Sequence, residues 1–311
     1  MIGIPSLRTI GNYLRLLVGD IAALARRHAL LISWSITKRL HDTVTINTKI
    51  GRFTVLTSDE AIGARLYQQG EFEIDLIKQS LGLLRGLKLV PPAGSGVLLD
   101  VGANNGVTSI AMLTLGEIRE AIAIEPEPRN FVLLQENVAQ NNLQRKTTLL
   151  NYAAAESAGQ LQFELSNVNS GDHRVRRVQQ SVSAEQHGES SRSVISVGAE
   201  TLDKLISGLP GDRLKDISLI WIDVQGYEGY VFAGATEILS RGTPVVTELW
   251  PYGLHRAGMT NDDFCTIARR HWSAYWVLRR GRFVKYPIGW LPSFLDELGA
   301  DGDYDNIIFV P

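Results

Sequence analysis

The sequence of 311 residues is poor in cysteine and has no long uncharged segment near its N-terminus. Cys265 is the single cysteine, so no intramolecular disulfide can form, and we expect a cytoplasmic protein from a reducing compartment. The N-terminus lacks a secretory signal pattern, and its longest uncharged run, residues 29–37, is far shorter than the roughly 20 residues of a membrane-spanning helix. We therefore expect neither export nor a transmembrane anchor.

The chain also lacks an excess of charge of either sign, since its formal net charge is −2. Without an overall positive field, we expect no nucleic-acid partner. The hydrophobic content of 44 % is that of an ordinary globular protein, which excludes disorder as a global description. Cys265 lies in a helical pattern over residues 262–270, which predicts a packing residue instead of a catalytic thiol.

The N-terminal segment, residues 1–43, is apolar and locally basic. Apolar residues are dense over residues 13–36 and no proline interrupts them, which predicts one or two helices. Over residues 7–40 the only acid is Asp20, against the basic residues Arg8, Arg15, Arg26, Arg27, Lys38 and Arg39. Two interpretations remain open: a helix packed on the main domain with its arginines in water, or a peripheral contact with anionic lipid at the inner face of a membrane.

Residues 44–90 form a second predicted segment ahead of the catalytic part. β-prone residues on both sides of Gly51 predict a hairpin, and residues 71–87 have the apolar spacing of a helix. A stretch rich in proline and glycine, residues 91–96, then interrupts the pattern. We place the start of the catalytic domain, residues 91–311, at this point.

Beyond residue 96, strand-like and helix-like segments alternate, which is typical of a mostly parallel sheet with helices on both faces. The strand-like segments are residues 97–101, 120–124, 147–152, 217–223 and 244–248, and the helix-like segments are residues 108–115 and 129–141. Residues 275–284 and 306–310 have no long helix between them, which favours antiparallel pairing. We therefore predict an α/β fold: a doubly wound, mostly parallel, seven-stranded Rossmann-like sheet with an antiparallel C-terminal strand and an N-terminal helical and hairpin extension.

A long polar stretch interrupts this alternation at residues 166–193. It is rich in Ser, Gln, Arg and His and has little periodicity, which predicts a long loop or lid. Loops of this length inside a compact domain are usually functional or mobile.

A tight glycine-bearing turn follows the first strand of the alternating region. Asp100, Gly102 and Gly106 form the pattern acidic-x-Gly-x-x-x-Gly, and a ligand can approach the backbone at both glycines. A dinucleotide site would need glycines at positions 102, 104 and 107, but this chain has Asn104 and Val107 at the last two. The turn therefore favours S-adenosylmethionine, which carries no pyrophosphate, over NAD.

Glu125 ends the next strand-like run. It follows the turn by about the interval at which adenosine-binding folds present a carboxylate to the ribose hydroxyls. Taken alone, the turn is also compatible with a plain structural connection, and Glu125 with a solvated carboxylate. Their combination in this order favours a cofactor site.

Several spaced motifs in the catalytic part are similar to those of one known family. In chain order they are Asp100–Gly106, Glu125-Pro126-Glu127-Pro128, Asn137, Thr201-Leu202-Asp203 and Ile222-Asp223-Val224-Gln225-Gly226-Tyr227-Glu228. Through these motifs the chain resembles an FkbM-type methyltransferase from about residue 70 to residue 248.

The resemblance implies a class I methyltransferase sheet, S-adenosylmethionine as methyl donor and, usually, O-methylation of a hydroxyl on a sugar, polyketide or related metabolite. It also implies which residues would surround the cofactor: Asp100, Gly102, Asn104, Gly106 and Glu125, with Ala153 or Ala154 near the adenine. Gln225 stands where many relatives carry Glu, which removes a charge beside the implied site.

Methyl transfer to a hydroxyl also needs a group that accepts the hydroxyl proton, because a neutral alcohol is a poor nucleophile. Asp223 and Glu248 end predicted central strands, at the edge where open parallel sheets bind ligands. His173 lies in the predicted lid, and the ordinary pKa of histidine suits proton acceptance. The structural alternatives are a capping or buried hydrogen-bonding role for Asp223 and a solvated loop position for His173.

We expect no metal centre, because the possible ligands lie far apart in the sequence. The leading interpretation is an enzyme that methylates a hydroxyl on a small-molecule, glycan or lipid-linked acceptor. The alternatives are an inactive methyltransferase-like binding module and a nicotinamide-dependent oxidoreductase. No motif indicates the identity of the acceptor or the oligomeric state.

Overall fold

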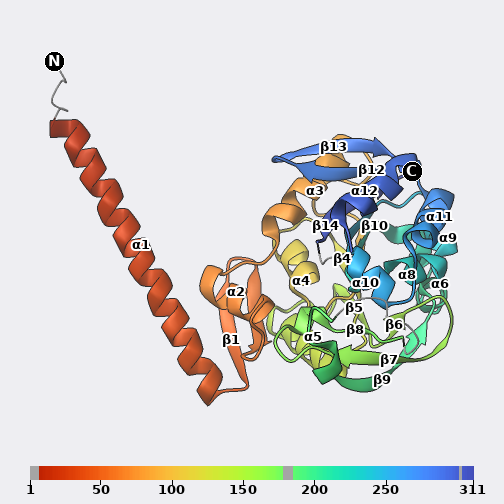
Figure 1. Cartoon of the computed structure of the whole chain (residues 1–311), viewed down its shortest axis with the longest axis horizontal. Coiled ribbons are helices and arrows are strands. Elements are labelled where there is room, and N and C mark those ends of the chain that lie inside the picture. Colours follow the sequence, from red (N-terminus) through yellow and green to blue (C-terminus); the bar gives the residue numbers. More distant parts are fainter. Residues whose placement is uncertain (1–6, 178–184, 301–302) are drawn as a thin grey trace.

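The computed structural model describes residues 7–177, 185–300 and 303–311, with side chains from Leu24 onward, and a large sheet forms its centre (Figure 1). The strands of this sheet are β3 (Val97–Val101), β4 (Glu120–Ile124), β5 (Thr147–Leu150), β10 (Ile217–Ile222), β11 (Val245–Leu249), β12 (Ala274–Arg279), β13 (Arg282–Pro287) and β14 (Asp305–Val310). Their spatial order is β13-β12-β14-β11-β10-β3-β4-β5. The five strands from β11 to β5 pair in parallel, which confirms a mostly parallel α/β sheet.

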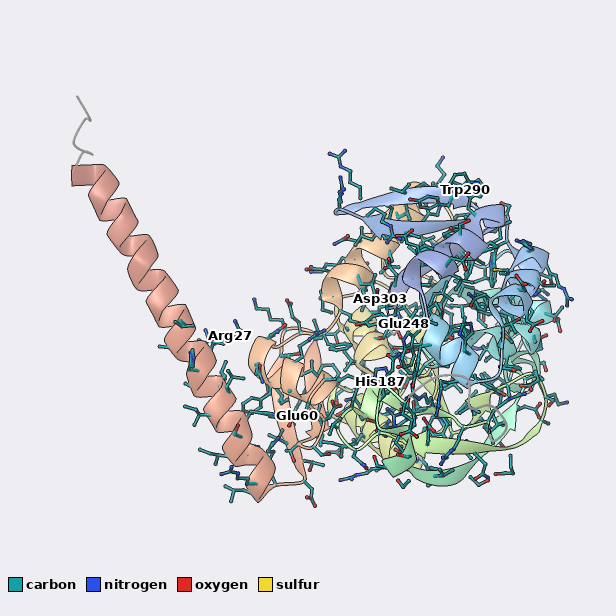
Figure 2. The ribbon with its side chains drawn as sticks, in the orientation of Figure 1. Arg27, Glu60, His187, Glu248, Trp290 and Asp303 are labelled. Carbon is teal, nitrogen blue, oxygen red and sulfur yellow. The ribbon has the colours of Figure 1, made fainter. Side chains whose placement is uncertain are left out.

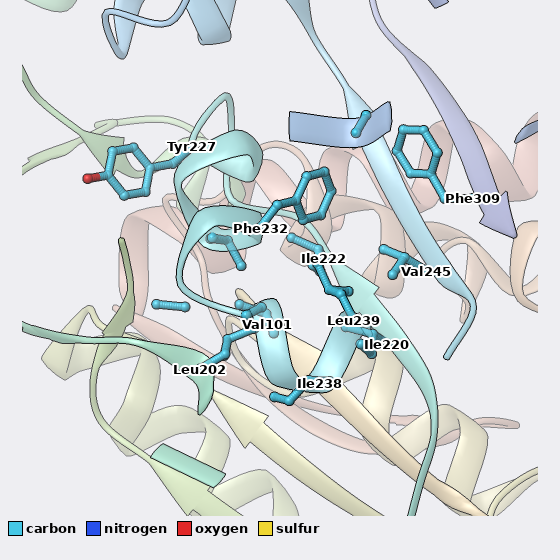
Figure 3. Packing of buried hydrophobic residues seen from close by; sticks show 14 of the residues in the cluster. Val101, Leu202, Ile220, Ile222, Tyr227, Phe232, Ile238, Leu239, Val245 and Phe309 are labelled. Atoms are coloured by element: carbon cyan, nitrogen blue, oxygen red, sulfur yellow. The ribbon is translucent and has the colours of Figure 1, made fainter. Parts of the chain in front are cut away.

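The central strands are apolar on both faces, as expected for parallel strands that helices cover on both sides. All five residues of β3 are buried, and its side chains alternate between two separate core clusters. Leu99 and Val101 belong to one cluster, whereas Leu98 belongs to the other. Figure 3 shows Val101 in the first cluster with Ile222 and Phe232.

Helices cover both faces of the sheet, and each core cluster identifies the helices on its side. The cluster that contains Leu99 also contains residues of seven helices: α6 (Leu202–Ser207), α7 (Arg213–Asp216), α8 (Glu228–Ala233), α9 (Thr236–Leu239), α10 (Pro251–Arg256), α11 (Asn261–His271) and α12 (Leu291–Leu298). The cluster that contains Leu98 also contains residues of α2 (Ile62–Gln69), α3 (Ile74–Gly86), α4 (Val107–Thr114) and α5 (Pro128–Gln140). Cys265 of α11 is buried in the first cluster, and burial raises the pKa of its thiol to about 11, as suits a packing residue.

The predicted count of seven strands is too low. In the described part of the chain the large sheet has eight strands, because residues 275–284 form a hairpin instead of one strand. Arg280 and Gly281 make the turn with φ of 49° and 77°, a left-handed geometry that closes tight hairpins. The predicted antiparallel pairing with β14 is present, through β12.

The described residues of the predicted loop, residues 166–193, are mostly irregular, but one short strand interrupts them. This strand, β8 (Arg174–Val175), joins a second sheet in the order β6-β9-β7-β8, whose other strands β6 (Ala153–Ala154), β7 (Gly159–Leu165) and β9 (Ser193–Glu200) border the stretch on both sides. Two single turns, η1 (Ser170–Asp172) and η2 (Glu189–Ser191), flank β8. Residues 178–184 of the predicted lid lie outside the described residues.

Buried ion pairs hold this region in place. Arg174 pairs with Glu164 and with Glu189 at 2.9 Å each, and Arg192 pairs with Asp172. All five side chains are buried, so each charge depends on its partners for the stabilisation that water would otherwise supply. The polar composition of the stretch therefore encodes an internal network, where the sequence pattern indicated a solvated loop.

The N-terminal part contains one long helix and a hairpin. Helix α1 (Leu7–Leu40) extends away from the body, and only its C-terminal half runs beside α2 (Figure 1). The hairpin strands are β1 (Thr43–Thr48) and β2 (Gly51–Leu56). No helix within the described residues has the length and apolar character needed to span a bilayer.

The hairpin shares a core with the large sheet. Phe53 and Val55 are fully buried in the same cluster as Ile110 of α4. The Asn137 side chain accepts a hydrogen bond from the Thr54 N–H at 2.7 Å and donates to the Thr54 carbonyl at 3.1 Å, so α5 binds the hairpin backbone through both groups of one amide. The motif residue Asn137 thus has a structural role at the junction of the N-terminal segment and the sheet.

Candidate active site

A cavity opens at the carboxyl ends of β3, β4 and β10. This is the edge where open parallel sheets bind ligands. Three parts of the chain line it: the sheet edge, the second sheet with its turn η1, and the start of α2 and α3. The predicted site residues that line it are Asp100, Gly102, Asn104, Glu125, Ala153, Ala154, His173 and Asp223.

The glycines of the turn are required by protein packing. Gly102 has φ of +84°, and a Cβ at this position would lie 1.8 Å from the carbonyl oxygen of Asp223. A Cβ on Gly106, at φ +89°, would meet Leu134 of α5 at 2.6 Å. The expectation that ligand approach explains both glycines therefore needs correction, because close approach of the neighbouring strand and helix already excludes a side chain.

Glu125 is bound by the backbone of its surroundings. Its Oε2 accepts the N–H of Asn104 at 2.8 Å, and its Oε1 accepts the N–H of Glu127 at 2.9 Å. Burial raises the pKa of Glu125 to about 8 despite these two hydrogen bonds, and the negative charges of Glu127 and Asp100 add to the effect. Glu125 is therefore a structured carboxyl at the cavity wall, and the solvated alternative is wrong.

Asp100 lies beneath the turn. Its Oδ2 accepts a hydrogen bond from the Ser109 hydroxyl at 2.5 Å, which links the end of β3 to the first turns of α4. Burial raises the pKa of Asp100 to about 6, and Ser109 opposes this shift.

Asn104 connects the turn to the second sheet. It has a left-handed backbone with φ of 52°, and its Nδ2 lies 3.5 Å from the hydroxyl oxygen of Ser170 in η1. That hydroxyl in turn donates to Asp59, just before α2. The cavity wall is therefore tied together across three distant parts of the sequence.

A second acidic group lies at the carboxyl ends of β10 and β11. Gln225 Nε2 donates to Asp223 Oδ1 at 2.6 Å and to Glu248 Oε1 at 3.1 Å, so one amide bridges both carboxylates. Burial raises the pKa of Asp223 and of Glu248, repulsion from Asp223 raises that of Glu248 further, and the Gln225 amide lowers both. Glu248 lies inside the body and does not itself line the cavity (Figure 2).

Glu73 joins this acidic group and was missed by the sequence analysis. It precedes α3 with a left-handed φ of 53°, lines the cavity, and makes no capping hydrogen bond to the helix. Burial raises its pKa to about 7, repulsion from Asp223 acts in the same direction, and Arg65 opposes both. No motif marks Glu73, because an acidic residue before a helix has the pattern of an ordinary N-cap.

Three non-glycine residues at this site have a left-handed backbone. Glu73, Asn104 and Gln225 have φ between 52° and 54°. Such positions are unfavourable for residues with a Cβ and persist only where the surrounding structure holds them. Each of these side chains lines the cavity or binds a residue that does.

The surroundings of His173 and Glu228 differ from those of Asp223. Burial lowers the pKa of His173 to about 4, and its Nδ1 accepts the Ser166 N–H at 3.0 Å, so it is a neutral and weak base at the cavity wall. Glu228 accepts the N–H groups of Val224 and Gly226 at 3.2 Å each, which gives it a structural role at the start of α8. Within the described residues no group of three His, Cys, Asp or Glu side chains is arranged to hold a metal ion.

A family model matches the part of the chain that holds most residues of this cavity. The Methyltransferase FkbM domain matches residues 100–264, just over half of the chain. The matched range contains the glycine turn, Glu125, Asp223 and Glu248. The chain belongs to the FkbM methyltransferase family.

Individual relatives cover parts of the chain. It is 30 % identical over 158 residues to the 2-O-methyltransferase NoeI of Sinorhizobium fredii (strain NBRC 101917 / NGR234), which is 49 % of this chain and 62 % of NoeI. Methyltransferase FkbM from Methylobacillus flagellatus KT is similar with a TM-score of 0.40 and 14 % identity, covering 72 % of this chain and 45 % of that one. The tRNA m1G37 methyltransferase of M. jannaschii is similar with a TM-score of 0.41 and 10 % identity, and the match covers 87 % of this chain and 57 % of that one. The chain thus spans less than two thirds of each of these proteins.

The FkbM domain does not supply the whole cavity. Its match begins at Asp100, so Glu125, His173 and Asp223 come from the family region, whereas Ile62 and Glu73 precede it. Residues that precede the matched FkbM domain therefore complete one wall of the site.

Proposed function

We propose that this FkbM methyltransferase binds S-adenosylmethionine in the cavity and transfers its methyl group to a hydroxyl of a sugar-containing or related metabolite. The observation that carries the proposal is the pair of acidic groups on opposite sides of β3. Glu125 lies at the end of β4, and Asp223 with Gln225 and Glu248 lies at the ends of β10 and β11. The name of the relative NoeI, a 2-O-methyltransferase, supports a hydroxyl as acceptor.

The residues around Glu125 fit the adenosine part of this cofactor. Each of its carboxylate oxygens accepts one backbone N–H and keeps a second lone pair, so the two oxygens can accept two ribose hydroxyls. Ala153 and Ala154 line the same wall with small side chains, which leaves room for a flat base. We assign the β4 side of the cavity to the cofactor on these grounds.

The residues around Asp223 fit the reacting side. Bound S-adenosylmethionine would supply an electrophilic methyl group on a positively charged sulfur. Asp223 would take the proton of the acceptor hydroxyl when the acceptor oxygen receives this methyl group, and S-adenosylhomocysteine would leave. Its raised pKa makes it a better base than an exposed aspartate, and the Gln225 amide holds its Oδ1 in place.

We place the acceptor near Glu73 and Ile62. These residues line the cavity from outside the family region, where substrate-specific features are expected to differ from the common cofactor site. Glu73 adds a polar group that can accept a hydrogen bond from an acceptor hydroxyl.

The test has a binding step and a turnover step. Calorimetry with S-adenosylhomocysteine and with NAD should show binding of the first only, and binding of NAD alone would contradict the cofactor assignment. Methyl-labelled S-adenosylmethionine should then label a hydroxyl oxygen of a product from a cell extract. Binding without turnover across extracts would favour the inactive module, and label on nitrogen or carbon would exclude O-methylation.

A further inference from the structure

The face of α1 that contacts α2 is short, and polar contacts lie at its centre. Trp34 is buried against α2, where its ring lies 5.1 Å from that of Tyr67 and its Nε1 donates to Glu60 at 3.3 Å. Lys38 pairs with the same Glu60, and the Ser33 hydroxyl lies 2.6 Å from the Tyr67 hydroxyl. Figure 2 shows Glu60 between α1 and the body. These contacts orient the helix about its own axis.

The face of α1 turned away from these contacts carries several exposed apolar side chains, with Ser35 and Arg39 among them. Ile32 is 61 % exposed and Ile36 is 50 % exposed, one helical turn apart, and Leu24 and Leu40 are 56 % and 69 % exposed. We call Leu24, Ile32, Ile36 and Leu40 the outer stripe. Four large apolar side chains along one helix are more than scattered surface residues, which indicates an interaction surface.

The charge of α1 indicates what this surface contacts. The helix carries six arginine or lysine residues and one aspartate, for a net charge of +5, in a chain whose formal net charge is −2. Arg39 follows Ile36 by three residues and Ile32 by seven, which places it on the same face as the outer stripe. Arg26 is also exposed.

We propose that α1 lies in the surface of an anionic lipid bilayer, with the outer stripe in the lipid and its basic residues at the headgroups. An apolar face flanked by basic residues is the pattern of helices that bind in the interface plane. A second copy of this chain would place two helices of charge +5 side by side, and their repulsion opposes that pairing. Anionic headgroups instead attract this charge.

This arrangement would bring the active site close to the membrane surface. Helix α2 contacts α1 through Tyr67, and its first residue, Ile62, lines the cavity. A membrane-bound α1 would therefore hold the acceptor wall near the lipid. The membrane proposal is tested without cofactor or acceptor, so its outcome is separate from that of methyl transfer.

The experiment is sedimentation of the full chain with vesicles of phosphatidylcholine, alone or mixed with phosphatidylglycerol. We expect binding to the mixed vesicles, weakened about tenfold or more in Ile32→Asp/Ile36→Asp, because two apolar side chains that would lie in the lipid are replaced by charged ones. Arg26→Gln/Arg39→Gln should lose about tenfold or more on the mixed vesicles through the lost charge. Val132→Asp, a change at a 58 % exposed apolar residue of α5, is the matched control and should bind like the wild type.

Two results would overturn the proposal. One is wild-type binding to neither vesicle, or equal binding of the wild type and Ile32→Asp/Ile36→Asp. The other is a wild type that does not bind vesicles and forms a dimer in analytical ultracentrifugation, where the isoleucine variant is a monomer. That result would assign the outer stripe to contact with a second copy of the chain. Unchanged thermal midpoints confirm that the variants are folded, and the arginine pair carries the test if the isoleucine pair unfolds.

Discussion

The two acidic groups on either side of Gly102 are built in different ways. Glu125 is held by backbone N–H groups of Asn104 and Glu127, which lie close to it in the fold whatever side chains those positions carry. Asp223 is held by the side chain of Gln225, which also binds Glu248. The first group therefore tolerates changes in its neighbours, whereas the second depends on each of its members.

This difference suits the two proposed tasks. A binding carboxylate needs a constant position, which a backbone cradle supplies. A proton acceptor needs a pKa adjusted by its neighbours, and Asp223, Glu248 and Glu73 influence one another through burial and repulsion. Changes at the β4 side should therefore affect affinity, and changes at the β10 side should affect rate and its pH dependence.

The largest effect is expected where the two sides meet. Gly102→Ala places a Cβ on the Asp223 carbonyl at a left-handed backbone position, and it should lower the free energy of unfolding by about 3 kcal/mol or more. Gly116→Ala is the matched control, because Gly116 has φ of +70° and open space around it. In the control, the free energy of unfolding should fall by only about 1 kcal/mol, because of the left-handed backbone alone. Denaturant unfolding measures both, and equal losses would show that contact between the strand ends is unimportant.

Asp223→Asn should separate rate from affinity. The change keeps the size of the side chain but removes the proton acceptor, so methyl transfer should fall about 10²-fold or more. Affinity for S-adenosylhomocysteine should stay near that of the wild type. Single-turnover rates and calorimetry measure the two quantities, with Asp216→Asn near the opposite end of β10 as control. A parallel loss of affinity would move Asp223 to the cofactor side.

Glu125→Gln should do the reverse. At a pH above about 8, where the Glu125 carboxyl is ionised, loss of the charged acceptor should weaken S-adenosylhomocysteine binding by about 1–3 kcal/mol, with the rate at saturating cofactor close to that of the wild type. Glu120→Gln, at the other end of the same strand, is the control. The difference between Glu125→Gln and wild type should shrink with 2′-deoxy analogues. An unchanged dissociation constant would remove Glu125 from the cofactor site.

Gln225→Glu should shift the pH dependence. The Gln225 amide lowers the pKa of Asp223 and Glu248, whereas a carboxylate would raise both by repulsion. Since Asp223 must be ionised to accept a proton, the rise of the rate with pH should move to higher pH, by about one unit. Activity is then lost near neutrality and recovered in alkali. A pH profile of kcat tests this, and an unshifted profile with lower kcat would indicate a purely structural role.

Local patterns predicted most of the central fold. The bounds of β3 and β4 agree with the sequence analysis, and α4 and α5 begin within one residue of their predicted starts. These elements combine an apolar run with a turn residue at its end, so neighbouring residues suffice to define them. The buried ion pairs around residues 166–193 were not predicted, for the opposite reason. Nothing in a polar stretch marks Arg174 and Arg192 as buried, and only folding brings them against Glu164 and Glu189.

By itself the sequence determined the order of the central parallel strands along the chain, the position of the glycine turn and the acidic residues Glu125 and Asp223, because each depends on spacing along the chain. Only the tertiary structure decided that Gly102 faces the carbonyl of Asp223, that Gln225 bridges Asp223 and Glu248, and that Glu73 joins them. These contacts connect residues from elements far apart in the chain. Their distances are set by how helices pack on the sheet, which no local pattern records.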